Sequence, residues 1–203
     1  MTLTNFVWLL ILAGAPQTPD LKNLPWQGWA QHETRGSTRL IYFTKTSGRP
    51  WDFSPGQVAI EYGQPVWKHA YAEKFDELTR NNRWRLGQNY WTNLDANFPV
   101  ALGTTRIEAG HYYLVVERSG EEGQWSLLLL DPRQTFSCRM DAWHVNRKEV
   151  PQGIRVPLEW EKVEKIADKL EIQFELDAED QQKATLTIRF GPHRLTVPVR
   201  AEF

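Results

Sequence analysis

The middle of the chain alternates between hydrophobic and polar positions with a period of two. Over residues 92–102 every second side chain shares one face, and that face consists of Thr92, Leu94, Ala96, Phe98, Val100 and Leu102. This alternation predicts a β-strand with one buried side. Residues 111–118 and 125–130 are denser in apolar residues, and the polar segment 119–124 between them contains glycine. The pair is therefore predicted to form a hairpin at the centre of a sheet.

Shorter alternating stretches on both sides of this region predict further strands. They cover residues 38–46, 57–62, 153–160, 170–176, 184–190 and 194–200, with a less regular one at 139–145. The dipeptide Gly191-Pro192 predicts a turn between the last two strands. The charge-rich segment 159–169 is interpreted as a solvated connection or a short helical turn.

Helical spacing is clearest at residues 71–80, where Tyr71, Phe75 and Leu78 share one face. We expect this short helix to cap one end of the sheet. Many short strands with turn residues between them and one helix predict an all-β fold. The expected architecture is an antiparallel β-sandwich, with a flattened barrel as the alternative.

The N-terminal segment 6–15 is an apolar run that ends in small residues, as a secretory signal peptide does. It is shorter than the roughly 20 apolar residues that span a bilayer. An N-terminal strand is the alternative interpretation, since no Lys or Arg precedes the run. We therefore expect a signal peptide at 1–15, an irregular lead-in with one strand at 16–50, and a single β-sandwich domain at 51–203. The mature protein would then be periplasmic or extracellular and have no transmembrane segment.

The chain has enough apolar residues to form a hydrophobic core without disulfide bonds. Hydrophobic residues make up 41% of the 203 residues, and ten of them are Trp and nine are Phe. The single cysteine, Cys138, has no partner for an internal disulfide and is expected to be a small buried side chain. Lys and Arg number 24 and Asp and Glu number 25, so no net positive field favours nucleic acid as a partner.

Four short motifs follow one another in a recognisable order. They are IEYGQP at 60–65, WRLGQN at 84–89, AGHY at 109–112 and the Trp-led strand at 125–130. In this order they resemble a bacterial family of exported proteins known as domain of unknown function twenty-nine-eleven, over about residues 54–200. The resemblance implies an exported all-β domain and no known activity. Many members have Arg and Glu where this chain has Gln64 and Tyr90, so a family site that depends on those two residues would be altered here.

The polar face of the predicted strand at 92–102 carries the candidate ligand-binding residues. These are Arg85, Asn89, Asn93, Asp95, Asn97 and His111. A polar groove is the functional interpretation, and an ordinary solvated sheet face is the alternative. Arg85 is the first candidate, because its guanidinium group suits a carboxylate or phosphate ligand, although it would equally hold Asp95 in place.

Known catalytic and cofactor motifs are missing from the sequence. It contains no HxH, HExxH or GxSxG motif and no glycine-rich nucleotide loop, so we expect no metal and no cofactor and assign no catalytic residue. His69, His144 and His193 lie in separate segments. The many Trp residues either belong to the core or form exposed platforms that stack on sugar rings.

The sequence therefore favours a non-enzymatic module that binds a protein, a glycan or a small ligand. One alternative is a hydrolase-like or metal-assisted enzyme in which Arg85, Asp95 and His111 converge. The other is a glycan-binding module that uses exposed Trp residues. A folded structure separates the three, because it shows which of these side chains share a concave surface.

Overall fold

The computed structural model describes residues 34–45, 53–146 and 149–202. All of them belong to one compact unit, Thr34–Phe203. The predicted signal peptide and most of the predicted lead-in lie outside the described residues, and the predicted domain boundaries stay predictions. In the part of the chain that the structure describes, no helix has the length and apolar character needed to cross a membrane.

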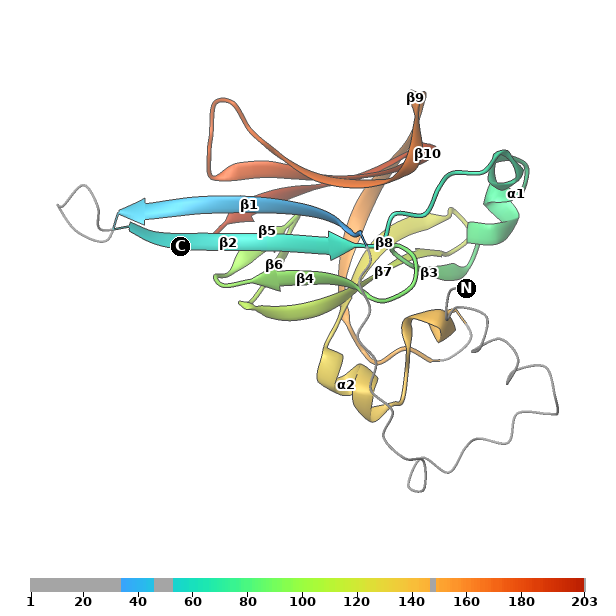
Figure 1. Ribbon diagram of the computed structural model, residues 1–203, viewed down its shortest axis with the longest axis horizontal. Coiled ribbons are helices and arrows are strands. Elements are labelled where there is room, and N and C mark those ends of the chain that lie inside the picture. The colour runs from blue at the N-terminus through green and yellow to red at the C-terminus, as the bar shows by residue number, and fades with distance from the viewer. Residues whose placement is uncertain (1–33, 46–52, 147–148, 203) are drawn as a thin grey trace. The chain divides into compact units, whose positions relative to one another are not determined.

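Strands dominate the described residues (Figure 1). They are β1 Gly36–Lys45, β2 Phe53–Tyr62, β3 Asn82–Arg85, β4 Thr92–Ala96, β5 Val100–Leu102, β6 Thr105–Ile107, β7 Gly110–Ser119, β8 Gln124–Leu130, β9 Ile154–Leu176 and β10 Lys183–Ala201. The helical elements are α1 His69–Thr79, α2 Pro132–Ser137 and the 3₁₀ turn η2 Ala142–His144. The predicted all-β fold is confirmed.

The strands form one antiparallel sheet that folds over itself at β9. Its order is β1-β2-β4-β7-β8-β9-β10-β5-β6, and β3 pairs with β7 beyond the end of β4. The first part of β9, residues 154–158, pairs with β8, and the rest, residues 159–176, pairs with β10. Figure 1 shows β9 and β10 lying across β1 and β2 as a second layer. The two layers share one apolar core, as the predicted β-sandwich requires.

A second contact between the layers joins the end of β2 to β9. The Tyr62 hydroxyl donates a hydrogen bond to the Ile172 carbonyl at 3.3 Å and accepts one from the Ile172 amide at 3.0 Å. Just beyond, the Gln64 amide donates to the Leu170 carbonyl at 3.3 Å, and Val66 forms a β-bridge with Lys169. Gln64 therefore helps to close the sandwich.

The predicted inward face at residues 92–102 is buried throughout. The prediction that these residues form one strand is wrong. All six residues of that face are at most 7% exposed. The chain instead forms β4, which pairs with β2 and β7, and then β5, which pairs with β10 and β6 in the other layer. Pro99 lies between the two strands and has no amide hydrogen for a ladder. The alternation continues because both strands face the same core.

Two predicted breaks in the second half of the chain are also wrong. The charge-rich segment 159–169 is part of β9, and Gly191-Pro192 lies inside β10. The ladder between β9 and β10 shifts register on both sides of Gly191, which has a φ of 60°. A residue in this conformation bends a strand without ending it, so the expected turn is a β-bulge.

The predicted helix at 71–80 is confirmed as α1, while the predicted strand at 139–145 is wrong. That segment follows α2 and contains η2. Each element begins at an Asp that caps it: Asp131 accepts a hydrogen bond from the Arg133 amide, and Asp141 accepts one from the Trp143 amide, both at 2.8 Å. Pro132 at the first turn of α2 suits a helix start. The expectation of a single helix missed these short elements.

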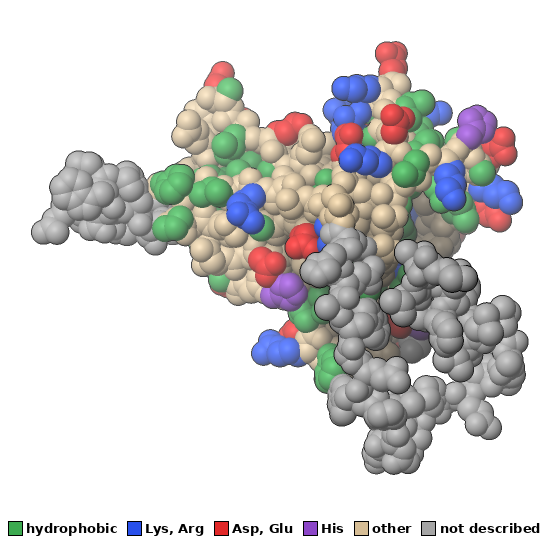
Figure 2. Space-filling model, in the orientation of Figure 1, with side chains coloured by type: hydrophobic (Ala, Val, Ile, Leu, Met, Phe, Trp, Pro, Cys, Tyr) green, Lys and Arg blue, Asp and Glu red, His purple; other side chains and the backbone are tan. Residues whose placement is uncertain are grey.

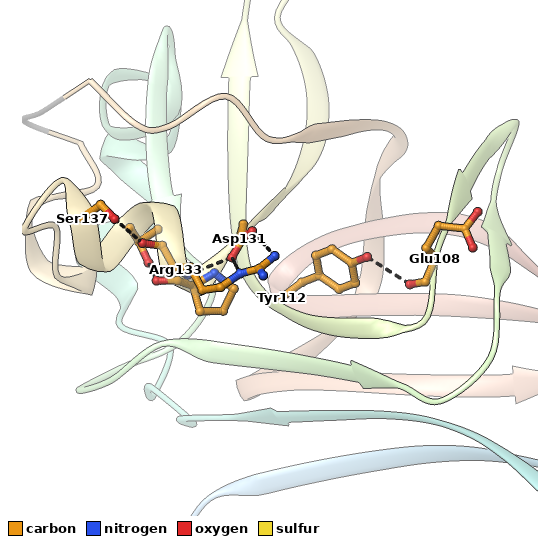
Figure 3. A network of polar contacts seen from close by, with 7 residues as sticks. Glu108, Tyr112, Asp131, Arg133 and Ser137 are labelled. Atoms are coloured by element: carbon orange, nitrogen blue, oxygen red, sulfur yellow. Dashed lines mark hydrogen bonds and ion pairs between the residues drawn. The ribbon is translucent and has the colours of Figure 1, made fainter.

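Figure 3 shows how α2 is fixed at the end of β8. The Arg133 guanidinium returns to the Asp131 carboxylate at 2.9 Å, and the Ser137 hydroxyl donates to the Arg133 carbonyl at 2.8 Å. Nearby, the Tyr112 hydroxyl donates to the Glu108 carbonyl at 3.0 Å. Cys138 ends α2 and is exposed. The expectation of a buried cysteine is therefore wrong, because this segment forms a surface helix instead of a core strand.

Candidate functional site

A cavity of about 460 Å³ opens at the end of the sandwich where α1 and β3 meet. It lies between the two layers, because its lining comes from β3 and β8 on one side and from β9 and β10 on the other. The segments around Trp67 and η2 complete the wall. Aromatic side chains predominate in the lining and comprise Trp67, Tyr71, Phe75, Trp84, Trp125, Trp143, Trp160 and Phe190. We call this cavity the aromatic cleft.

One wall of the aromatic cleft is a cluster of rings around Phe190. Trp67 meets Phe190 edge to face at 5.0 Å between ring centroids, and Trp84 lies on Phe190 at 5.3 Å. Trp67 also meets Tyr71 of α1 at 5.6 Å. Such edge-to-face pairs are the arrangement that aromatic rings prefer. The Trp67 ring rests directly on Gly191, where a larger residue would occupy the same space.

His193 extends this cluster and is stacked between further aromatic rings. Its ring lies parallel to Phe75 at 3.5 Å between centroids, and Trp160 lies on it at 5.9 Å. Its Nδ1 atom is buried and has no hydrogen-bond partner among the described residues. Burial lowers the pKa of His193 to about 4, and the positive charges of Lys162 and Arg118 contribute in the same direction. The imidazole is therefore neutral at physiological pH.

Helix α1 covers the aromatic cleft with no buried residue of its own. Phe75 is stacked on His193, and two polar contacts from β7 hold the end of the helix. The Arg118 guanidinium lies 2.7 Å from the Asp76 carboxylate and donates to the Thr79 hydroxyl at 2.9 Å. The hydrogen bond from Arg118, with a second from Arg80, lowers the pKa of Asp76. Ring contacts of Tyr71 and Phe75 and these polar contacts thus hold the helix over the cleft.

The η2 turn reaches the aromatic cleft because it packs on the outer face of β7 and β8. Val145 joins a small second core with Val115, Leu128 and Leu130. Ala142 and Val145 line the cleft from this position, and Trp143 lies at its rim. Trp143 is 58% exposed, and Trp160 of β9, which also lines the cleft, is 44% exposed.

Arg85 at the end of β3 lies under the exposed Trp143. Its guanidinium carbon is 3.8 Å from the centre of the Trp143 ring, which is cation–π distance. Burial lowers the pKa of Arg85, and the more distant charge of Asp141 opposes this change. The ion pairs and hydrogen bonds of the described residues do not include the Arg85 side chain. Arg85 therefore brings an unpaired positive charge to the cleft.

The charge of the aromatic cleft differs from that of the surrounding surface. On the visible face of the described residues, side chains of both signs are interspersed (Figure 2). The described residues of the cleft lining include Arg83 and Arg85 and no Asp, Glu or Lys. Arg83 is neutralised by Glu117, whose carboxylate lies 2.8 Å from the Arg83 Nε and also contacts Arg155. Of the two arginines among the described lining residues, Arg85 is therefore the one without an ion pair.

Replacing Glu117 with glutamine is expected to destabilise the fold by about 1 to 2 kcal/mol at neutral pH, because two charged hydrogen bonds are weakened. Burial alone would raise the pKa of Glu117, but the hydrogen bonds from Arg155 and Arg83 outweigh it and lower the pKa. The carboxylate thus stabilises the fold above its unfolded pKa, and the contribution is lost as the pH falls through the folded pKa. Urea unfolding of both proteins at neutral and acidic pH measures this difference.

The control for this variant is Glu121→Gln, in the exposed turn between β7 and β8, which should leave stability unchanged at either pH. A difference between Glu117→Gln and the wild type that stays the same in acid would contradict the role of the carboxylate charge.

Two of the residues predicted from the sequence contact each other on the outer face of the sheet. Asp95 on β4 is the cross-strand partner of His111 on β7, and the Asp95 carboxylate lies 2.5 Å from His111 Nδ1. Both side chains are exposed. An Asp in this position orients the imidazole and leaves its Nε2 directed elsewhere.

Arg85 does not join Asp95 and His111. It pairs with Val115, four residues from His111 along β7, which is roughly 13 Å at strand spacing. Its guanidinium is engaged with Trp143. The structure therefore divides the predicted candidates between two places, with Arg85 at the aromatic cleft and the Asp95–His111 pair on the sheet face.

The three candidate asparagines have local positions. Asn97 accepts a hydrogen bond from the Gln57 amide at 2.6 Å and donates to the Pro55 carbonyl at 3.2 Å, so it fixes the start of β2. Asn89 has a φ of 64° in the turn before β4. Asn93 lies opposite Tyr113, and its buried side-chain oxygen has no partner among the described residues.

Sequence reasoning missed His193, Phe75 and Trp160 as parts of one site. They come from β10, α1 and β9, and no local motif connects them. The usable signal was the large number of Trp residues, because Trp67, Trp84 and Trp143 all line the cleft. No group of three or more His, Cys, Asp or Glu side chains suited to a metal ion occurs among the described residues.

Comparison with known proteins identifies one similarity. The model of a family described as a protein of unknown function (DUF2911) matches residues 50–199, which include most of the described sandwich and the whole aromatic cleft. No curated protein and no solved structure matches the chain.

Proposed function

The chain belongs to the DUF2911 family of proteins of unknown function, and we propose that it is a non-enzymatic binding module that holds a small organic ligand in its aromatic cleft. The size of the cleft supports this proposal. Its volume of about 460 Å³ lies within the range of roughly 300 to 1,000 Å³ that is usual for small-molecule sites. Such sites are lined mainly by apolar and aromatic side chains with a few polar groups, as this one is.

The observation that carries the proposal is the exposure of two tryptophans that both line an aromatic cavity. Trp143 and Trp160 are 58% and 44% exposed, although Trp is a residue that folding normally buries. Exposed apolar groups that gather at one place are typical of a binding surface. A flat apolar ligand would cover both rings and remove their apolar area from water.

Glycan binding is the second candidate, and the amide side chains of the lining favour it. Asn82, Gln88 and Asn146 line the cleft beside the aromatic rings, and amides bind sugar hydroxyl groups.

An enzyme is supported less well, because the Asp95–His111 pair lies on an exposed sheet face apart from Arg85. Residues 6–15 have the pattern of a signal peptide, so we propose that the ligand is met outside the cytoplasm.

Replacing Trp160 with alanine is expected to weaken binding of a flat apolar ligand by about tenfold. An aromatic pair contributes up to about 1.5 kcal/mol beyond its buried area, and 1.4 kcal/mol corresponds to a factor of ten. Titration calorimetry and intrinsic tryptophan fluorescence measure the affinity, with naphthalene methanol, cello-oligosaccharides and chito-oligosaccharides as probes. Tight binding of an oligosaccharide alone would select the glycan candidate.

The control is Phe136→Ala, which removes a more exposed ring from α2, outside the aromatic cleft. It should leave every affinity unchanged. If the Trp160 and Phe136 variants bind the probes as the wild type does, the cleft is not the binding site.

A further inference from the structure

We propose that the ligand of the aromatic cleft is an organic monoanion with a flat apolar body, and that Arg85 binds its carboxylate or phosphate group. This inference deepens the function proposed above and depends on it. It assigns to Arg85 the choice between ligands of different charge, and to the aromatic walls the affinity for the apolar body.

The charged side chains that line the cleft favour an anionic ligand. Among the described residues that line it, the charged side chains are Arg83 and Arg85. The charge of Arg83 is compensated, because its Nε lies 2.8 Å from the buried Glu117 carboxylate. Among the described lining residues, an incoming anion would therefore meet one cation without an ion pair, and an incoming cation would meet no carboxylate.

The Arg85 guanidinium has N–H donors that are available to a ligand. Its face is engaged with the Trp143 ring at 3.8 Å, and this contact uses the π surface of the guanidinium. Its N–H groups point outward in the plane of the group, where they form no hydrogen bond with another described residue. A planar fork of N–H donors suits the two oxygens of a carboxylate or phosphate.

The charge of Arg85 is partly shielded from water. Arg85 is partly buried beneath Trp143, and burial lowers its pKa because it penalises the charged form. Arg85 forms no ion pair with a described residue, and the charge of Asp141 offsets only part of the effect of burial, so an anionic ligand at the guanidinium would reduce the remaining penalty. The same partial exclusion of water strengthens the attraction between Arg85 and an anion.

His193 adds an aromatic ring and no charge to the cleft. His193 is neutral at physiological pH, so it does not provide a second cation inside the cleft. Its ring continues the aromatic wall formed by Phe75 and Trp160. The apolar part of the ligand would lie between these rings, and its charged end would lie at Arg85 near the rim.

The test compares three probes of nearly equal shape and different charge, binding to the full chain. Naphthoate carries a carboxylate, naphthalene methanol is neutral, and naphthylmethylamine is a cation. Calorimetry on the wild type is expected to give at least about tenfold tighter binding of naphthoate than of the neutral probe, since hydrogen bonds to charged groups have this size. The amine is expected to bind most weakly.

Variants at Arg85 separate charge from shape. Arg85→Gln should lose at least about tenfold in naphthoate affinity, with a smaller change for naphthalene methanol. Arg85→Lys should retain part of the preference, because it keeps the charge and loses the planar fork. Arg133→Gln is the matched control, since Arg133 lies on α2 and is 91% exposed, and it should change nothing. Melting temperatures show whether each variant is folded.

The outcomes distinguish the two proposals. Equal affinity for the three probes, or a preference for the neutral or cationic one, would overturn the anion assignment and leave the cleft as a binding site. An anion preference that survives in Arg85→Gln would also overturn it. No measurable binding of any probe would mean that the cleft is not a small-molecule site, and both proposals would fall.

Discussion

Replacing Gly191 with alanine should cost about 3 kcal/mol of folding free energy and displace the Trp67 ring. Gly191 has a φ of 60°, where any residue with a Cβ is strained by about 1 kcal/mol. A Cβ at this position would also lie 2.6 Å from Cε3 of Trp67, well inside van der Waals contact. Overpacking of this kind adds roughly 1 to 3 kcal/mol. Urea unfolding measures the loss, and tryptophan fluorescence reports the displaced ring.

Gly120→Ala provides a control with the same backbone conformation. Gly120 has a φ of 79°, and a Cβ there would meet nothing within 4 Å. This variant should therefore lose only the strain energy of about 1 kcal/mol. Equal losses in the two variants would contradict the close contact between Gly191 and Trp67, and with it the position of the ring that forms one wall of the cleft.

Acid should destabilise the fold through His193. The folded pKa is about 4, and the ordinary pKa of a histidine is 6.5, so between these two pH values the unfolded chain binds a proton that the folded protein excludes. The contribution is fully present above pH 6.5 and is lost as the pH falls towards 4. One pH unit of pKa difference corresponds to about 1.4 kcal/mol. Partial exposure of the ring reduces this effect, so we expect a total loss of about 2 kcal/mol.

The variant His193→Phe isolates this effect, because phenylalanine still stacks on Phe75 but does not titrate. The charged neighbours Lys162 and Arg118, and the carboxylates elsewhere in the chain, remain in both proteins. The difference in unfolding free energy between wild type and variant should change by about 2 kcal/mol as the pH falls through this window. A constant difference would show that the imidazole is not excluded from protonation by the fold.

The period-two pattern predicted much of the architecture because most strands have one face on a single core. Residues 92–102 show this most clearly, since their inward positions are all buried although the segment divides into β4 and β5. The pattern did not show the division, because both strands face the same apolar interior from different layers. Pro99 was the local sign of the break.

The long strands β9 and β10 were harder to predict for a physical reason. Residues such as Glu161 and Lys162 face solvent within β9, so their charge resembles that of a loop. They are held in the strand by pairing with β10, where Arg194 forms an ion pair with Glu161 at 2.5 Å. Such pairing lies some thirty residues away in the sequence and leaves no local periodic pattern.

The sequence indicated the residue types of the aromatic cleft but not their arrangement. The abundance of Trp suggested exposed platforms, and the guanidinium group of Arg85 suggested anion binding. The position of His193 between Phe75 and Trp160 depends on the docking of α1 against two distant strands. That docking is a tertiary event, and no spacing along the chain encodes it.

The first residues of β9 pair with β8 and the remaining ones pair with β10. Strand β9 therefore belongs to both layers of the sandwich. Loss of this strand would strip both layers of a neighbour at once, so the described sandwich should melt as one cooperative unit. Its formation during folding must also wait for segments far apart in the chain, such as β1 and β9, to meet. A topology of this kind has high contact order, and slow folding is its kinetic consequence.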